Sequence, residues 1–326
     1  MFSLSLVFSQ SNVSVSKDAS GMKLLVDGKE FMINGMNWDY IPIGTNTVDA
    51  KFWEKSDDII KAGLDSEMSL LRNMGVNVIR QYTGVPARWI RYIYENYGIY
   101  TMLNHSFGRY GLTLNGVWTP VTIYDDPVTE EFLMQEVTQL VEEYKGTPGL
   151  LFYLLGNENN YGLFWQGAET EDFPDDEDQK AYIGEKRGRP MYKLMNEAAK
   201  AMKAIDPSRP VALCNGDVLF IDIIAEECPD IDIYGTNTYR GISFTNMFDT
   251  VKDKLDMALV FTEFGSDAYN AKENREDQKM QAYYNLGNWK EIYQHAAGLG
   301  KTGISIGGFT FQFSDGWWKY GFDDRE

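Results

Sequence analysis

The sequence of 326 residues predicts an α/β protein folded as a (β/α)8 TIM barrel. Three observations predict this fold. The length suits one barrel, which typically needs about 250 residues plus loop insertions. From residue 34 onward, short apolar runs alternate with helical patterns, as in repeated βα units around a parallel sheet. Eight strands with seven helices between them can be counted, which fits a closed barrel better than an open sheet.

A short N-terminal β-hairpin is expected before the barrel. Residues 23–33 read LLV, then Asp27-Gly28, then EFMI, the pattern of two strands joined by a two-residue turn. Such a hairpin can plug the bottom of a barrel. We therefore expect a leader or disordered N-terminus over residues 1–22 and a single barrel domain over residues 23–326.

The strands and helices then follow in chain order. Strands are predicted at residues 34–38, 76–82, 98–104, 150–156, 210–214, 231–236, 258–263 and 304–313. Two helices are indicated by apolar residues at helical spacing: Ile60, Leu64, Met68 and Leu71 before Gly75, and Leu133, Val137, Leu140 and Tyr144 before Gly146. The others are predicted at residues 86–97, 189–205, 217–227, 244–255 and 277–298. Only 13 residues follow Phe313, so we expect an incomplete last βα unit.

The composition restricts the classes of partner that the protein is expected to bind. A net charge of −18 and a pI of about 4.6 disfavour nucleic acid and anionic membranes. A neutral substrate is the natural complement, and an aromatic content of 14% suits flat apolar faces such as those of sugar rings. No apolar run approaches the roughly 18 residues of a transmembrane segment. The start, MFSLSLVFSQS, resembles a shortened signal peptide, which favours a secreted or periplasmic location over a cytoplasmic one.

Two glutamates follow apolar strands directly. The fourth strand ends in Gly156-Asn157-Glu158 and the seventh in Glu263-Phe264-Gly265. Active sites of such barrels lie at the carboxyl ends of the strands, so both carboxyls are expected on opposite walls of one mouth. Two carboxyls about 5–5.5 Å apart are the requirement of retaining glycosidases. The alternative is that one of the two glutamates only pairs with an arginine of the barrel.

Further side chains are expected around these carboxyls. Arg80, within VIRQY, would keep a neighbouring carboxylate ionised, and Tyr239 would donate a hydrogen bond to the same group. Asn157 would bind the substrate 2-OH. We expect Glu158 to be protonated at rest, because a neighbouring carboxylate raises its pKa. The remaining candidates for substrate binding are His105, Asn37, Trp38, Trp317 and Trp318, with plain packing as the alternative for the last two.

Four motifs together carry a resemblance. LLGNENN around Glu158, VFTEFG around Glu263, NVIRQY and NTYRG look like clan A glycoside hydrolases over residues 31–318. The nearest match is the catalytic barrel of family 2, which includes β-galactosidases, β-glucuronidases and β-mannosidases. The resemblance implies a retaining mechanism, in which Glu158 is the acid/base and Glu263 the nucleophile.

The motifs do not identify the sugar of the substrate. Family 2 enzymes normally carry β-sandwich domains before the barrel, and FQFSDGWWK at the eighth strand differs from the usual pattern. We predict a retaining β-glycoside hydrolase acting on β-linked oligo- or polysaccharide of β-glucan or β-galactoside type. The alternatives are a β-glucan transglycosylase and a non-catalytic carbohydrate-binding barrel. No cofactor and no metal are expected: His105 and His295 are the only histidines, which excludes an HExxH site, and the two cysteines form no CxxC motif.

Overall fold

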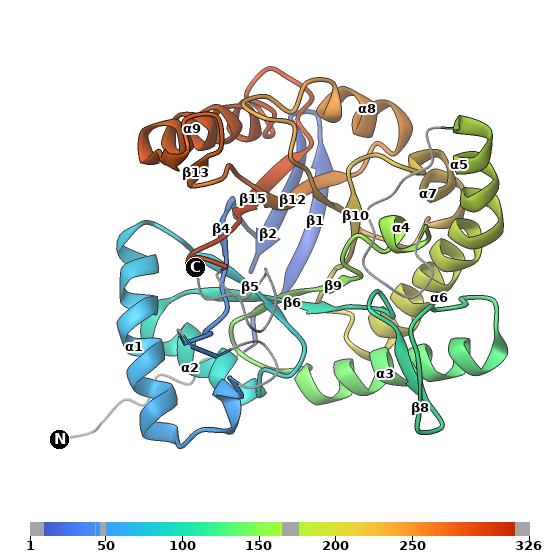
Figure 1. The fold of residues 1–326 in the computed structure, drawn as a ribbon, viewed down its shortest axis with the longest axis horizontal. Coiled ribbons are helices and arrows are strands. Elements are labelled where there is room, and N and C mark those ends of the chain that lie inside the picture. The colour runs from blue at the N-terminus through green and yellow to red at the C-terminus, as the bar shows by residue number, and fades with distance from the viewer. Residues whose placement is uncertain (1–9, 43, 46–49, 165–175, 317–326) are drawn as a thin grey trace.

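The computed structural model describes residues 10–42, 44–45, 50–164 and 176–316. Eight parallel strands close into a barrel in the order β10-β11-β12-β15-β4-β5-β6-β9, with helices around it (Figure 1). The predicted (β/α)8 fold is thus confirmed, and every predicted strand overlaps an observed one. The barrel strands are β4 (Ile33–Asn37), β5 (Val78–Tyr82), β6 (Tyr100–His105), β9 (Leu150–Leu155), β10 (Val211–Gly216), β11 (Ile233–Asn237), β12 (Ala258–Phe264) and β15 (Ser305–Thr310).

The helices cover the barrel with their apolar faces. They include α1 (Asp57–Asn73), α2 (Ala87–Tyr97), α3 (Pro127–Tyr144), α6 (Arg189–Ile205), α7 (Ile221–Glu227), α8 (Met247–Lys254) and α9 (Gln278–Gln294). Helix α1 buries the four apolar residues that predicted it, which are Ile60, Leu64, Met68 and Leu71. Helix α3 begins with Pro127, and the side chain of Asp126 caps it by accepting a hydrogen bond from the amide of Thr129. Two shorter helices, α4 (Asn159–Gly162) and α5 (Glu177–Ile183), lie between β9 and α6.

A three-stranded antiparallel sheet precedes the barrel. It consists of β1 (Val13–Asp18), β2 (Gly21–Val26) and β3 (Lys29–Glu30), and Asp27-Gly28 form the predicted turn between β2 and β3. The amide of Val13 donates to the carbonyl of Ser208, and the amide of Met22 to that of Gly303. Because these two acceptors precede β10 and β15, the sheet covers the amino ends of the barrel strands.

The structure differs from the expected leader over residues 1–22 in one respect. Residues 13–18 form β1 and pair along their whole length with β2. The reason is the alternation in VSVSKD, which lets Val13 join the core while the polar residues stay outside. Residues 1–9 lie outside the described part of the chain.

Two further features concern the end of the chain and a hairpin in a loop of the barrel. Strand β15 ends at Thr310, three residues before the predicted end. The expected incomplete last unit falls on residues 314–326, of which 317–326 lie outside the described part. An unpredicted hairpin of β7 (Leu112–Leu114) and β8 (Val117–Thr119) lies between β6 and α3. Within the described residues, no helix has both the length and the apolarity needed to cross a membrane.

Candidate active site

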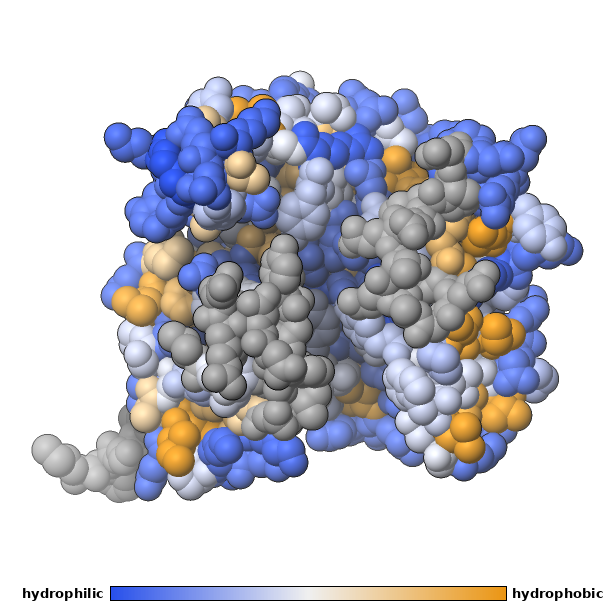
Figure 2. Space-filling view, in the orientation of Figure 1, coloured by the Kyte–Doolittle hydropathy of each residue, from blue (hydrophilic) through white to orange (hydrophobic). Residues whose placement is uncertain are grey.

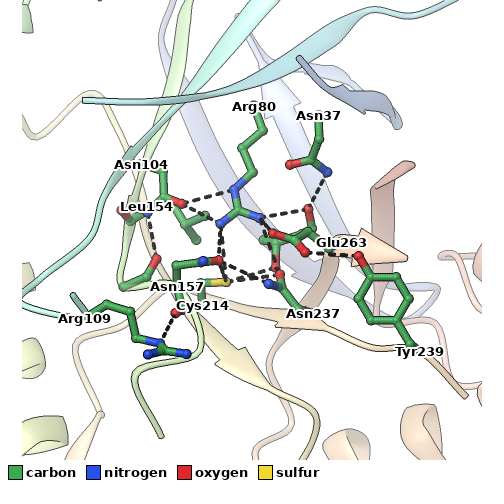
Figure 3. Close-up of polar contacts among 12 residues, drawn as sticks. Asn37, Arg80, Asn104, Arg109, Leu154, Asn157, Cys214, Asn237, Tyr239 and Glu263 are labelled. Atoms are coloured by element: carbon green, nitrogen blue, oxygen red, sulfur yellow. Dashed lines mark hydrogen bonds and ion pairs between the residues drawn. The ribbon is translucent and has the colours of Figure 1, made fainter. Parts of the chain in front are cut away.

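Glu263 lies near the carboxyl end of β12 and has two partners in the barrel mouth. Arg80 of β5 places its Nη1 2.7 Å from Oε1 of Glu263, and the Tyr239 hydroxyl donates to Oε2 at 3.0 Å (Figure 3). The Arg80 side chain is completely buried, and that of Glu263 is 10% exposed. Both carboxylate oxygens therefore accept a hydrogen bond, one of them charge-assisted, and the two donors hold the carboxylate in place.

Arg80 is fixed by further bonds from other strands. Its Nη2 donates to Oδ1 of Asn104 at 2.6 Å and to Oδ1 of Asn157 at 2.7 Å. Its Nη1 also lies 3.4 Å from Oδ1 of Asn237 on β11. A guanidinium held on several sides has one orientation, so the carboxylate that it contacts is held as well.

Glu158 follows β9 in a tight turn. Gly156 has a φ of 82°, and a side chain there would meet Oδ1 of Asn159 at 2.8 Å. Glu158 itself has a φ of 57°, which is uncommon for a residue with a side chain and costs about 1–3 kcal/mol. Such a conformation persists only where its surroundings enforce it.

Three bonds enforce the turn. The amide of Asn157 donates to Oδ1 of Asn159 at 2.7 Å, and Nε of Arg109 donates to the carbonyl of Asn157 at 2.9 Å. The amide of Glu158 donates to the carbonyl of Cys214 on β10 at 3.1 Å. The backbone that carries Glu158 is thus tied to its own turn and to two other segments.

The environment of Glu158 favours its protonated form. Burial, and secondarily the nearby charge of Glu263, raises the pKa of Glu158 to about 7, against a hydrogen bond from Asn237 that lowers it. The raised pKa agrees with the prediction from the sequence, but its larger cause is burial and not the neighbouring carboxylate. The two glutamates thus differ: the carboxylate of Glu263 accepts from two donors, whereas burial raises the pKa of Glu158.

Asn37 and Asn157 lie beside the two glutamates. Nδ2 of Asn37 donates to the carbonyl of Thr262 at 3.0 Å, directly before Glu263. Asn157 accepts from Arg80 and Asn237 and donates through Nδ2 to the Tyr110 hydroxyl at 2.8 Å. The space-filling view of this face shows a hollow with a hydrophilic floor near the centre (Figure 2).

Two predicted residues point away from this cluster. His105 lies on the side of α3, where Nε2 is 3.5 Å from Oε2 of Glu136 and Nδ1 accepts from the amide of Phe107. Side chains alternate along a strand, so Asn104 faces Arg80 and His105 faces outward. Trp38 is 2% exposed, donates to Glu67 at 2.5 Å and packs against Phe52. It is a core residue in this structure. Trp317 and Trp318 lie outside the described residues.

Several residues that contact Arg80, Asn157 or the Glu158 turn are not predicted from the sequence. They are Asn104, Arg109, Tyr110, Cys214 and Asn237. Asn237 stands inside the GTNTYRG stretch, and Asn104 directly precedes the histidine that was chosen. Alternation along each strand was the available signal, because it separates inward from outward positions. Arg109 and Tyr110 lie in a loop, where no periodicity identifies them.

The arrangement of possible metal ligands and of the Cys214 thiol can be described for the same ranges. Among residues 10–316 other than 43, 46–49 and 165–175, no three His, Cys, Asp or Glu side chains are grouped to hold a metal ion. Cys214 is a free thiol in the floor of the cluster, 3.2 Å from Oγ1 of Thr262. Burial raises its pKa to about 11, so it stays a neutral thiol.

The raised pKa of Glu158 has a consequence for stability. Since the folded pKa of about 7 exceeds the ordinary 4.5, this residue's favourable contribution is complete below pH 4.5 and lost as the pH rises through 7. Glu158→Gln should therefore stabilise the fold at pH 8.5 by on the order of 1–3 kcal/mol and have little effect near pH 4.5. Thermal unfolding at both pH values measures this. Glu131→Gln, at an exposed position of α3, is the control, and an equal change in Tm at both pH values for Glu158→Gln would contradict the expectation.

Known proteins resemble the chain in sequence. Residues 18–297 match the glycosyl hydrolases family 2, TIM barrel domain. A probable 1,3-beta-glucanosyltransferase of Saccharomyces cerevisiae is 25% identical over 275 residues, covering 78% of this chain and 49% of that protein.

Solved structures resemble it in fold. A β-glucuronidase of Bacteroides uniformis has a TM-score of 0.61 at 13% identity, over 92% of this chain and 32% of that one. A galacturonate-bound family 2 β-galacturonidase of Eisenbergiella tayi has a TM-score of 0.60 at 13% identity, over 95% of this chain and 49% of that one. The chain thus spans half or less of the length of these three proteins. Because the family match extends over most of the sequence, this chain belongs to glycosyl hydrolase family 2 and contains its TIM barrel domain.

Proposed function

We propose that the protein is a retaining β-glycoside hydrolase that acts on β-linked oligo- or polysaccharides of β-glucan or β-galactoside type. One observation carries the proposal. Two glutamates lie at the carboxyl ends of barrel strands in different surroundings: Glu263 accepts from Arg80 and Tyr239, whereas burial raises the pKa of Glu158 to about 7. A nucleophilic carboxylate beside a protonated carboxylic acid is the pair that double displacement needs.

The first step forms a covalent glycosyl-enzyme. An oxygen of Glu263 attacks the anomeric carbon, and the bond from that carbon to the glycosidic oxygen breaks. The bonding electrons go to the leaving oxygen, which takes the proton of Glu158. Arg80 orients Glu263 through one carboxylate oxygen, while Tyr239 holds the second oxygen.

The second step releases the sugar. Glu158, now a carboxylate, removes a proton from water, and the water oxygen attacks the anomeric carbon on the face that the leaving group vacated. The ester bond to Glu263 breaks, and that carboxylate is restored. Two inversions at one carbon give a product with the configuration of the substrate.

The stereochemical outcome tests this proposal directly. With aryl β-glycosides of several sugars and with β-linked oligosaccharides, at least one substrate should be cleaved. Proton NMR during the first minutes should show the β-anomer before mutarotation. An initial α-anomer would indicate inversion, and binding of glucan without cleavage of any substrate would indicate a carbohydrate-binding barrel.

Transglycosylation is the second candidate. The yeast relative at 25% identity is a probable 1,3-beta-glucanosyltransferase, and transfer would use the same covalent intermediate with a sugar hydroxyl in place of water. Product analysis at high oligosaccharide concentration distinguishes the two reactions, because transfer produces chains longer than the substrate.

A further inference from the structure

The β7–β8 hairpin carries exposed aromatic side chains on the rim of the barrel mouth. It lies in the loop between β6 and α3 and projects beside α3 (Figure 1). Tyr110, just before β7, is 45% exposed, and Trp118 on β8 is 58% exposed. A side chain on Gly111 would lie 2.8 Å from Cζ2 of Trp118, so the indole ring rests against the backbone next to Tyr110. The Trp118 indole thus lies one residue along the chain from Tyr110.

Tyr110 is connected directly to the residues around the two glutamates. The Tyr110 hydroxyl accepts a hydrogen bond from Nδ2 of Asn157, which directly precedes Glu158. The guanidinium of Arg109 lies 5.2 Å from the centre of the Tyr110 ring, and Nε of Arg109 donates to the carbonyl of Asn157. The position of Tyr110 is therefore coupled to the turn that carries Glu158.

The strand order places the hairpin on one side of the mouth. In the closed barrel, β6 is the fourth strand from β12 in either direction, so it stands across the mouth from Glu263. It neighbours β9, whose end carries Glu158. The loop after β6 is therefore beside the predicted acid/base and opposite the predicted nucleophile.

In double displacement, the leaving group departs in line with and away from the attacking carboxylate, and the acid/base protonates its oxygen. A leaving sugar consequently extends from Glu263 past Glu158 toward the loop after β6. Sugars present apolar C–H faces, which pack well against exposed aromatic rings.

We propose that Tyr110 and Trp118 form an aromatic subsite for the sugar ring on the leaving-group side of the scissile bond. This inference rests on the proposed function and names the part of the substrate that the hairpin recognises. The same subsite holds the acceptor sugar when the covalent intermediate is resolved by transfer, so it favours transfer over hydrolysis.

The experiment compares two donors with the same glycone. A β-glycosyl fluoride has no leaving sugar, whereas a β-linked tetrasaccharide has one. Trp118→Ala should lower kcat/KM for the tetrasaccharide about tenfold and leave kcat/KM for the fluoride unchanged. With the fluoride as donor and a β-linked disaccharide as acceptor, the ratio of transfer to hydrolysis should also fall.

Two matched variants serve as controls. Trp118→Phe retains an aromatic face and should recover most of the tetrasaccharide activity. Val117→Ala, at a position on the same hairpin that is 67% exposed, should change neither donor. Equal loss on both donors, or no loss on the tetrasaccharide, would overturn the subsite. If the wild-type protein cleaves neither donor, the proposed function fails instead.

Discussion

Glu263→Gln should lower turnover by on the order of 10⁴–10⁶-fold while the fold is retained. The carbonyl oxygen of glutamine can still accept a hydrogen bond from Arg80, but a neutral amide cannot attack the anomeric carbon. Steady-state kinetics on the best aryl β-glycoside measures the loss, and circular dichroism checks the fold. Residual activity above a few per cent, after contamination is excluded, would rule out Glu263 as nucleophile.

A second readout separates a nucleophile from a residue that only pairs with Arg80. Because Glu263 would form the covalent bond, a 2-deoxy-2-fluoro glycoside should label this residue alone, as peptide mass spectrometry detects. In Glu263→Ala, azide should enter from the nucleophile's side and give an α-glycosyl azide of inverted configuration. His105→Ala is the control, since His105 faces α3 and its loss should leave labelling unchanged.

The loss of activity in Glu158→Ala should be larger for leaving groups that need a proton more strongly. A sugar alkoxide leaves poorly, so cleavage of oligosaccharides should fall by on the order of 10²–10⁴-fold. A dinitrophenolate leaves without help, so the first step on such a substrate should be spared. The second step then stalls, because the same residue activates water. Pre-steady-state kinetics should show a burst followed by slow turnover.

Azide should also identify the role of Glu158. In Glu158→Ala it can attack the accumulated intermediate without a general base, so turnover of the activated substrate should recover. The product should be a β-glycosyl azide of retained configuration, opposite to that from Glu263→Ala. Equal loss on both substrate types without rescue would mean that Glu158 has a structural role only.

The sequence predicts the strands and helices of this protein well, because both follow the periodic spacing of apolar residues. Strand and helix patterns depend on the repeats of buried positions, and the two glutamates stand directly after buried strands. The motif around Arg80 predicts a partner for a carboxylate, and Glu263 is that partner in the structure.

Inward and outward positions at the strand ends were harder to predict. His105 was chosen for its chemistry, yet Asn104 faces Arg80, because alternation and not residue type decides which side chain enters the barrel. Trp38 was expected at the substrate, but its indole is buried against Phe52 and Trp53. Tyr110 is positioned by a loop and a hairpin. The long-range contacts of such segments produce no periodic pattern in the sequence.

Arg80 has hydrogen-bond partners from both halves of the chain. Arg80, Asn104 and Asn157 come from the part that ends with the turn after β9, whereas Asn237 and Glu263 come from the part that begins with β10. Each half of the barrel thus contains one glutamate, and Arg80 comes from the half that does not contain its ion-pair partner Glu263. This buried ion pair therefore forms only when the two halves of the barrel join.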